Sequence, residues 1–408
     1  MEFIADLQIH SRFARACSKN ITLDNLEKYA RIKGINLLST GDFQHPVWNK
    51  EIKQNLQEDE NGILWSKNKF PFIWGTEVSL MYSENGRRAV HLLIYAPNGE
   101  VADQIIDVLA KKGRLDYDGR PIFGISCPEF VDMMLAVSRD IEIVTAHSFT
   151  SWFGVFGSKS GFNSIEECFK DKSRHIHAIE SGMSADPYMI RLISKLDRFN
   201  IVSFSDAHSP FPWRIGRESV IFNCDLKYEN ILKAMRTGEG IKETIETDPS
   251  YGRYHLDGHR SCGIVLEPEE TKRINAICPK CHKPLTVGVL SRILELADRE
   301  TPVNVPKFKK LIPLHELIAS VYDIKQLSSK KVWYTYNQLI SAFGDEFTVL
   351  IKTPYESLLK VVHKNLAQLI MNNREAKLKI YSGFDGVYGK IILDDNEKIK
   401  TQTSLGQF

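Results

Sequence analysis

The chain has 408 residues, 53 of them basic and 51 acidic, and 43% of its residues are apolar. This length suits two or three domains, and the composition is ordinary for a soluble globular protein with a sizeable core. There is no run of about eighteen apolar residues, which excludes a membrane span. The start MEFIADLQIH lacks the basic and apolar pattern of a signal peptide, so we expect a cytoplasmic protein. The net charge of +2 neither requires nor excludes a nucleic-acid partner.

Residues 1–247 alternate between short apolar strands and helical stretches. The expected strands are 2–9, 37–40, 72–77, 89–95, 142–146, 178–180 and 201–204. The expected helices are 23–33, 101–111, 127–136, 164–169 and 187–199. This alternation predicts an α/β barrel with a parallel sheet, in which the chemistry lies at the carboxyl ends of the strands.

Each expected strand ends in, or runs into, a side chain that can bind a metal. In chain order these are Asp6, Gln8, His10, Asp42, Glu77, His91, His147, Glu180, Asp206 and His208. His91 fits least well because it lies early in its strand. The repetition of an apolar strand followed by a ligand favours a metal site, whereas any one of these histidines alone would be read as a structural residue.

Phosphate-ester hydrolysis at neutral pH needs a hydroxide nucleophile, stabilisation of the developing charge and help for the leaving group. Two or three clustered divalent metals supply all of these. Histidines suit zinc or manganese and carboxylates suit harder ions. Alternate residues of a strand point the same way, so Gln8 and His10 can face one ion, as can Asp206 and His208.

The long segment after His147, SFTSWFGVFGSKSGFNS, places aromatic side chains among serines and glycines. Such aromatics can stack on an unpaired base or wedge into a base step, and a lysine can contact a phosphate. We expect Trp152, Phe153, Phe156 and Lys159 to contact DNA. The alternative, that the aromatics pack as a lid on the barrel rim, stays open.

Residues 248–299 contain three of the seven cysteines, and the other four are scattered singly. The pairs His259-x-x-Cys262 and Cys278-x-x-Cys281 have the spacing of a closed tetrahedral zinc site. A structural zinc would replace the core that such a short segment lacks. His255 and His282 compete with His259 for the fourth position. Arg253 and Arg260 suggest phosphate contacts, and a solvated surface is the plainer alternative.

Residues 300–408 predict a mostly helical domain. Helices are expected at 314–322 and 331–343, followed by a β-hairpin through 383–386 and a frayed tail after Leu393. Basic residues interleaved with aromatics favour DNA binding by this domain.

A family resemblance accompanies these patterns. The segments that carry it are DLQIHS, TGD, GTE, VHLLIY, TAHSF, AIESG and SDAH, in this order. They resemble the ordered motifs of the PHP (polymerase and histidinol phosphatase) family over roughly the first 210 residues. The resemblance implies a distorted βα barrel that holds two or three divalent metals, zinc, manganese or magnesium.

The same resemblance implies a distribution of ligands. Gln8, His10, Glu77 and Asp206 would surround one metal. Glu77 would bridge to a second metal held with His91 and His147. Asp42 and His208 would hold a third.

The sequence also departs from the PHP pattern. Gln8 stands in place of the first histidine of the family's opening motif, and Gly41-Asp42 replaces an Asp-His pair. No histidine lies near residues 15–19, and Lys19 is expected to supply some of the missing charge.

Within the PHP family, the chain most resembles the endonuclease Q group, nucleases that nick DNA on the 5′ side of deaminated bases. The segments that carry this are HSRFARACSKNIT, STGDFQHPVW, AHSFTSWFGVFGSKSGFNSIEECF, YHLDGHRSCGI, CPKCHKPLTVGVL and GFDGVYGKI. The resemblance implies a DNA-repair endonuclease that acts at uracil, hypoxanthine, xanthine or abasic sites, with Glu77, His147, Asp206 and Lys19 as catalytic residues.

The expected partner is damaged double- or single-stranded DNA, and replication or repair proteins remain open as further partners. Two other functions also stay open. One is a phosphatase of small phosphomonoesters. The other is a nucleic-acid-binding protein without catalysis, which the replacement by Gln8 makes conceivable.

Overall fold

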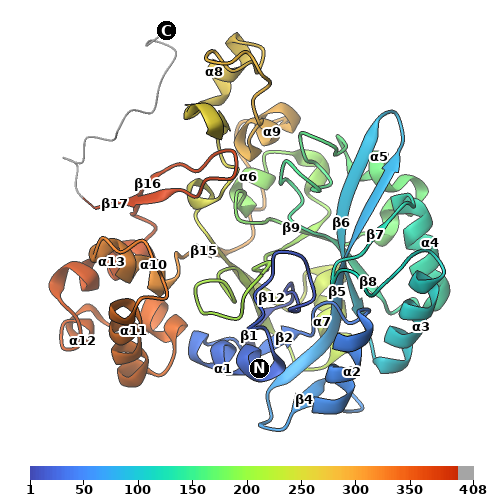
Figure 1. Ribbon diagram of the computed structural model, residues 1–408, viewed down its shortest axis with the longest axis horizontal. Coiled ribbons are helices and arrows are strands. Elements are labelled where there is room, and N and C mark those ends of the chain that lie inside the picture. The colour runs from blue at the N-terminus through green and yellow to red at the C-terminus, as the bar shows by residue number, and fades with distance from the viewer. Residues whose placement is uncertain (394–408) are drawn as a thin grey trace.

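The computed structural model describes residues 1–393, and the tail expected after Leu393 lies outside the described residues. Its centre is a curled sheet of seven strands (Figure 1). They are β1 (Glu2–Asp6), β2 (Leu37–Ser39), β5 (Pro71–Ser83), β6 (Arg87–Ala96), β8 (Glu142–Thr145), β9 (Ala178–Glu180) and β10 (Asn200–Val202). A bridge between Ile9 and Ala207 joins the ends of β1 and β10, so the sheet curls into the expected distorted barrel.

The expectation of a purely parallel sheet is wrong. β1, β2 and β5 are parallel to one another, as are β8, β9 and β10, but β6 is antiparallel to both β5 and β8. A tight hairpin connects β5 to β6, and a chain that turns back through so few residues must pair antiparallel. The start of β6 therefore lies at the same end of the barrel as the carboxyl ends of the other strands.

The helices cover the outside of this sheet. They are α1 (Leu23–Lys33), α2 (Pro46–Asn55), α3 (Gly99–Ala110), α4 (Cys127–Val137), α5 (Ile165–Phe169), α6 (Pro187–Ile190) and α7 (Tyr228–Thr237). The side chain of Thr22 accepts a hydrogen bond from Asn25 N and begins α1, and Gly34 ends it with φ 96°. The long helix expected at 187–199 is mostly turns, because Leu192 and Ile193 bond three residues back rather than four.

Three strands extend the sheet beyond β1: β11 (Ser219–Asn223), β12 (Ile241–Glu246) and β15 (Phe308–Lys310). Two smaller strands, β4 (Leu64–Ser66) and β7 (Ile122–Phe123), pair with β5, and β3 (Leu56–Glu58) pairs with β4. β15 pairs in parallel with β12, so the barrel sheet includes a strand from beyond the cysteine module. A domain boundary at residue 300 therefore cuts across the sheet.

The cysteine-containing segment forms a small unit above the barrel (Figure 1). It contains the hairpin β13 (Asp257–His259) and β14 (Ile264–Leu266), followed by α8 (Pro268–Arg273) and α9 (Val289–Leu296). Its own core comprises little more than Ile264, Leu266, Cys278 and Leu285. So few apolar side chains supply little burial energy, which fits a unit that a metal completes.

The C-terminal part is helical and ends in the expected hairpin (Figure 1). It consists of α10 (Leu314–Val321), α11 (Lys330–Phe343), α12 (Tyr355–Leu358) and α13 (Lys364–Arg374), with β16 (Lys379–Tyr381) paired to β17 (Lys390–Ile392). Among the described helices, none combines the length and apolar composition of a bilayer span.

Candidate active site

A cavity of about 500 Å³ opens at the end of the barrel where the predicted ligands gather. Its wall includes Gln8, His91, His147, Asp206 and His208. Two groups of side chains lie in this wall and directly beneath it, and within each group the ligand atoms all lie within 4.8 Å of one another. The structure therefore brings together residues from the whole first half of the chain.

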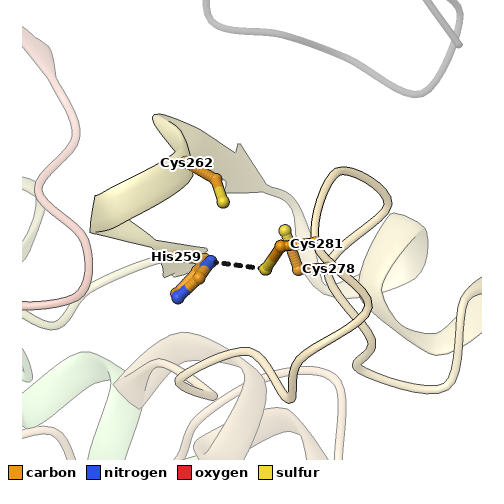
Figure 2. A group of neighbouring side chains, drawn as sticks. All are labelled: His259, Cys262, Cys278 and Cys281. Carbon is orange, nitrogen blue, oxygen red and sulfur yellow. Dashed lines mark hydrogen bonds between the residues drawn. The ribbon is translucent and has the colours of Figure 1, made fainter.

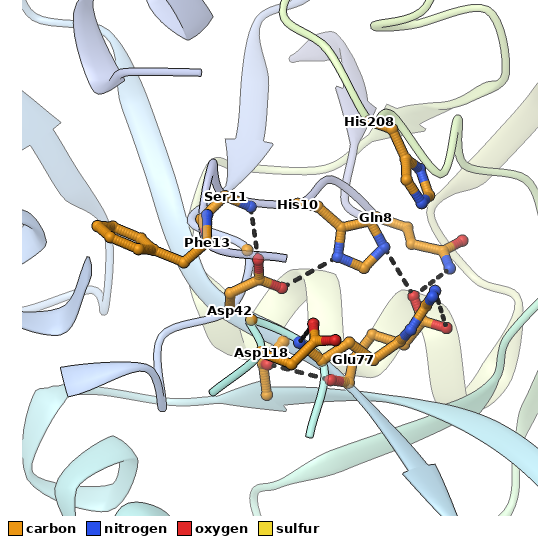
Figure 3. Close-up of polar contacts among 12 residues, drawn as sticks. Gln8, His10, Ser11, Phe13, Asp42, Glu77, Asp118 and His208 are labelled. Atoms are coloured by element: carbon orange, nitrogen blue, oxygen red, sulfur yellow. Dashed lines mark hydrogen bonds and ion pairs between the residues drawn. The ribbon is translucent and has the colours of Figure 1, made fainter. Parts of the chain in front are cut away.

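The first group is His10, Asp206 and His208. His10 Nε2 lies 3.1 Å from an oxygen of Asp206, and His208 Nδ1 lies 3.6 Å from the same oxygen. Asp42 stands behind His10, with Oδ1 3.0 Å from His10 Nδ1 (Figure 3). A carboxylate on the far nitrogen of a ligating histidine fixes the orientation of the ring. Asp42 is thus placed to orient His10, and His208 groups with the first set rather than with Asp42.

The second group is Glu77, His91 and His147. Glu77 Oε1 lies 2.6 Å from His91 Nδ1 and 3.4 Å from His147 Nε2, and the two ring nitrogens are 3.1 Å apart. Ligand atoms at about 2 Å from one tetrahedral zinc are themselves about 3.3 Å apart. The other oxygen of Glu77 lies 3.1 Å from His10 Nε2, so this carboxylate connects the two groups.

Gln8 reaches Glu77 as well. Its side-chain amide donates to Glu77 Oε2 over 3.1 Å (Figure 3). Buried atoms of three residues close to these groups lack a hydrogen-bond partner: Gln8 Oε1, His147 Nδ1 and Glu180 Oε1, and Glu218 Oε2 in the same wall lacks one as well. Buried polar atoms nearly always have a hydrogen-bond partner. Nitrogen and oxygen atoms that lack one, beside a cluster of histidines and carboxylates, therefore fit a metal site.

The ionisation states of His91, Glu77 and Asp206 suit ligation. Burial lowers the pKa of His91 to about 3, so its ring is neutral. Burial would raise the pKa of Glu77, but Arg120 and the histidines outweigh it and hold this pKa well below its usual value. For Asp206, His208 and His10 likewise outweigh burial and lower the pKa. Neutral imidazoles and charged carboxylates are the forms that bind metals. At His10, burial lowers the pKa, but Asp42, Asp206 and Glu77 outweigh it and raise the pKa well above its usual value, so this ring has to lose a proton to bind a metal.

Three of the predicted ligands have a left-handed backbone: φ is 41° at Asp42, 31° at His147 and 48° at Asp206. Residues other than glycine rarely adopt this conformation, and it clusters at functional sites. Each of them follows a strand and turns its side chain back over the barrel end.

The cysteine module holds a third group, His259, Cys262, Cys278 and Cys281, whose side chains face one another (Figure 2). Cys281 Sγ lies 3.3 Å from His259 Nδ1. His255 and His282 do not belong to this group. One sulfur-rich set of four donors fits a structural zinc.

The segment after His147 is mostly packed rather than free. Phe156 is 1% exposed and stacks on Phe149 at 4.8 Å, so it offers no face to a base and is excluded from the expected DNA contacts. Phe153 stacks on His91 at 4.3 Å. Trp152 is 48% exposed and lines the cavity, with Lys159 Nζ 5.8 Å from its ring.

Comparisons with known proteins identify the fold. The lesion-specific endonuclease PfuEndoQ from Pyrococcus furiosus superimposes with a TM-score of 0.84 and 33% identity, over 97% of this chain and 96% of that one. The chain belongs to the endonuclease Q family. A solved complex of endonuclease Q with a 27-mer duplex that carries an abasic lesion at the active site gives a TM-score of 0.87, with 32% identity over 97% of each chain.

Two uncharacterised proteins are also similar. YqxK of Bacillus subtilis is 29% identical over 95% of this chain and 98% of its own length. MJ0043 of Methanocaldococcus jannaschii is 36% identical over 63% of this chain, which covers only 33% of that longer protein. A family profile described as the MJ0043 C-terminal domain matches residues 313–377, directly after β15.

Some residues of the endonuclease Q site carry no signal in the sequence. Arg120 lines the cavity with Nη1 3.5 Å from Glu77 Oε1. Lys19, which was expected to supply this charge, is exposed and does not line the cavity. Arg217 and Tyr388 also lie in the wall. Arg120 and Arg217 stand in no recognisable pattern, because a lone arginine looks the same in a site and on a surface. Tyr388 lies within the GFDGVYGKI segment, but that segment does not single it out.

Proposed function

We propose that the chain is a metal-dependent DNA endonuclease that hydrolyses the phosphodiester bond on the 5′ side of a deaminated base or an abasic site. The observation that carries this proposal is the cavity itself. It combines two groups of histidine and carboxylate ligands with the exposed ring of Trp152. A metal site beside an aromatic surface suits cleavage next to an extruded nucleotide.

Two metals are supported better than three. His10, Asp206 and His208 would hold one, and Glu77, His91 and His147 the other, with Gln8 Oε1 as a further oxygen donor. Asp42 is occupied by His10 and by Ser11 N, so a third ion at Asp42 has no support. The mixture of nitrogen and oxygen donors suits zinc or manganese better than magnesium.

When bound, such metals supply a hydroxide nucleophile and stabilise negative charge on the phosphate oxygens. The residues of the chain do the rest. Arg120 presents a guanidinium to the same region and adds positive charge for the pentavalent transition state. Asp42 holds the His10 ring in place, and the Phe153 ring packs against His91.

The remaining DNA contacts are proposed from position. Arg253 and Arg260 both approach the turn of the C-terminal hairpin: Arg253 Nε donates to Gly386 O over 3.1 Å, and the backbone N of Arg260 donates to Asp385 over 2.6 Å. Arg253 and Trp152 line the cavity, and Lys159 lies beside the Trp152 ring, so we infer that a duplex passes over these side chains and Arg260. His259, Cys262, Cys278 and Cys281 would hold one structural zinc.

The test is cleavage of end-labelled duplexes that carry uracil, hypoxanthine, xanthine, an abasic site or no lesion, with zinc, manganese and magnesium in turn. We expect a single cut directly 5′ of the lesion and no cut in the undamaged duplex. Asp206→Asn should abolish cleavage while leaving the melting temperature within a few degrees.

Other results would reject the proposal. Hydrolysis of a chromogenic phosphomonoester without any DNA cleavage would indicate a small-molecule phosphatase. Tight binding of the duplexes with no cut in any metal would indicate a binding protein without catalysis.

A further inference from the structure

Three arginines and one tyrosine form a cluster in the cavity wall beside the first ligand group. Arg217 Nη1 donates to the Tyr388 hydroxyl over 3.2 Å. The guanidinium carbons of Arg214 and Arg253 lie 5.5 and 5.3 Å from the centre of the Tyr388 ring. All four residues line the same cavity as Asp206 and His208.

The cluster is assembled from three distant parts of the chain. Arg214 and Arg217 follow the ligand segment that ends in His208, Arg253 comes from the start of the cysteine module, and Tyr388 comes from the β16–β17 hairpin. A phenol ring that contacts three guanidiniums fixes where their donors point, and cation–π contact supports this arrangement. Tyr388 is therefore a positioning residue for the three arginines.

The positive charge of this cluster is poorly matched by the protein. Arg217 is 8% exposed, and its Nε donates to the Ser205 carbonyl over 2.9 Å. Within residues 1–393, no ion pair joins Arg217 to a carboxylate. Arg253 likewise forms no ion pair among the described residues and donates to the carbonyl of Gly386, whereas Arg214 pairs with Glu316 at 3.2 Å. Among the described residues, Glu316 is thus the one carboxylate in an ion pair with any of the three guanidiniums, and Asp206 and Glu218 act on Arg217 only from beyond ion-pair distance.

The neighbouring Glu218 does not supply the missing charge. It is fully buried in the same wall, and its Oε2 has no hydrogen-bond partner. Burial, with help from Glu246, raises the pKa of Glu218 well above its usual value, although Arg217 acts in the opposite direction, so this carboxyl is a poor counterion for Arg217. A buried guanidinium without a counterion is costly, and a bound anion would remove that cost.

We propose that Arg214, Arg217 and Arg253 bind a backbone phosphodiester of the substrate, next to the one that is cleaved. This inference rests on the proposed function. Guanidiniums only donate, so their ligand must be an acceptor, and the phosphodiester is the anionic acceptor of a polynucleotide. Because the arginines share one cavity with the ligand groups, a single strand can contact both. Fixing a second phosphate would set the register of the scissile bond.

The test removes charge from the substrate, from the protein, and from both together. Each phosphodiester within three nucleotides of the cut is replaced in turn by an uncharged methylphosphonate, and kcat/KM is measured for wild type, Arg253→Met and Tyr388→Phe. Arg253 is exposed, so its replacement should fold. Arg139→Met is the matched control, since Arg139 is an exposed arginine at the start of β8, at the opposite end of the barrel.

We expect one methylphosphonate position beside the scissile bond to lower wild-type kcat/KM by about tenfold or more. At that position, Arg253→Met should lose little further, because the charge it would meet is already gone. Tyr388→Phe should show the same dependence more weakly, and Arg139→Met should behave as wild type. If Arg253→Met lowers kcat/KM by the same factor at every methylphosphonate position as it does with the fully charged substrate, the inference is overturned.

Two further measurements complete the test. One distinguishes binding of a DNA phosphate from binding of free phosphate, and the other distinguishes failure of this inference from failure of the proposed function. Inhibition of the wild type by inorganic phosphate, together with a methylphosphonate scan that has no effect, would mean that the arginines bind free phosphate rather than DNA, which also overturns the inference. If the wild type cleaves no duplex, the proposed function fails by itself. The same scan read by fluorescence anisotropy of binding would then still decide the phosphate contact.

Discussion

At the scale of single residues, Asp42 supports the predicted metal ligand His10. Asp42 accepts from Ser11 N over 2.5 Å and contacts His10 Nδ1 over 3.0 Å, and it is fully buried. Loss of such an orienting carboxylate typically lowers metal affinity about 10- to 100-fold. We expect Asp42→Asn to weaken metal binding to this extent, and excess metal to restore cleavage.

Metal titration and elemental analysis of the saturated protein would check this. If Asp42 only orients His10, the saturated variant binds as many active-site metals as the wild type. A saturated Asp42→Asn protein with one metal fewer per chain would mean instead that Asp42 is itself a ligand.

Glu246 makes stability depend on pH. Its carboxyl is fully buried, and burial raises its pKa from 4.5 to about 7, although Ser181 and Ser203 donate hydrogen bonds to it. The folded state therefore binds this proton more tightly than the unfolded state. The resulting stability is complete below pH 4.5 and is lost as the pH rises through 7, by about 3 kcal/mol at most.

Glu246→Gln should remove this dependence, because an amide does not titrate. Urea unfolding between pH 5 and pH 8 would measure it. The wild type should lose stability relative to the variant as the pH rises, and a constant difference across this range would contradict the assignment.

At the scale of elements, the loop after His147 is hydrogen-bonded to the cysteine module. Arg292 of α9 donates to the carbonyls of Phe156 and Phe162 over 2.8 and 3.0 Å, and Ser151 Oγ donates to Val287 O over 2.7 Å. The loop that begins at a predicted ligand is thus fastened to the cysteine module.

Disruption of the cysteine group should therefore loosen this loop. We expect Cys281→Ser to lose the module's metal, to increase proteolysis within residues 148–163 and to lower DNA cleavage by about tenfold or more, since a small displacement of catalytic groups has a large effect on rate. Cys224→Ser, a change at a half-buried cysteine beyond β11, is the control. Unchanged proteolysis in the Cys281→Ser protein would show that the module does not hold the loop.

The strands also show what the sequence could and could not predict. Apolar runs followed by polar residues located the strand ends. Buried strand residues must be apolar, whereas the residues that face the site at the strand ends must be polar. The direction of β6 was missed because an apolar run reads the same in either direction. For this reason His91 looked misplaced within its predicted strand. In the structure it lies beside the end of β8, where Ala146 N donates to His91 O over 3.1 Å.

At the scale of the whole molecule, a buried ion pair joins the barrel to the C-terminal helices. Lys33 of α1 contacts Glu346 at 2.7 Å, and both are at most 1% exposed. The Tyr336 hydroxyl and Leu314 N also donate to Glu346. Removing one partner of a buried pair typically costs about 3–5 kcal/mol, because the other charge stays buried.

We therefore expect Lys33→Met to destabilise the chain by about this amount, and Lys33→Met with Glu346→Gln by less than the sum of the single changes. Equilibrium urea unfolding of the four proteins would measure the coupling. Additive effects would mean that the two charges do not depend on each other.

Contacts of this long range mark the limit of sequence reasoning. Two of the C-terminal helices, α10 and α11, and the hairpin were predicted from local pattern, whereas α12 and α13 were not. The docking of these elements was not predictable, because Lys33 and Glu346 are separated by 313 residues and neither stands out locally. The same applies to the cavity wall, where Tyr388 meets Arg217 only through the fold.

The left-handed backbone at Asp42, His147 and Asp206 has a consequence for how such an enzyme evolves. A glycine at any of these positions would relieve conformational strain while removing the side chain that the site needs. Selection for stability alone would thus favour the residue that ends catalysis. In this chain, stability and the proposed activity therefore make opposite demands on the same three backbone positions.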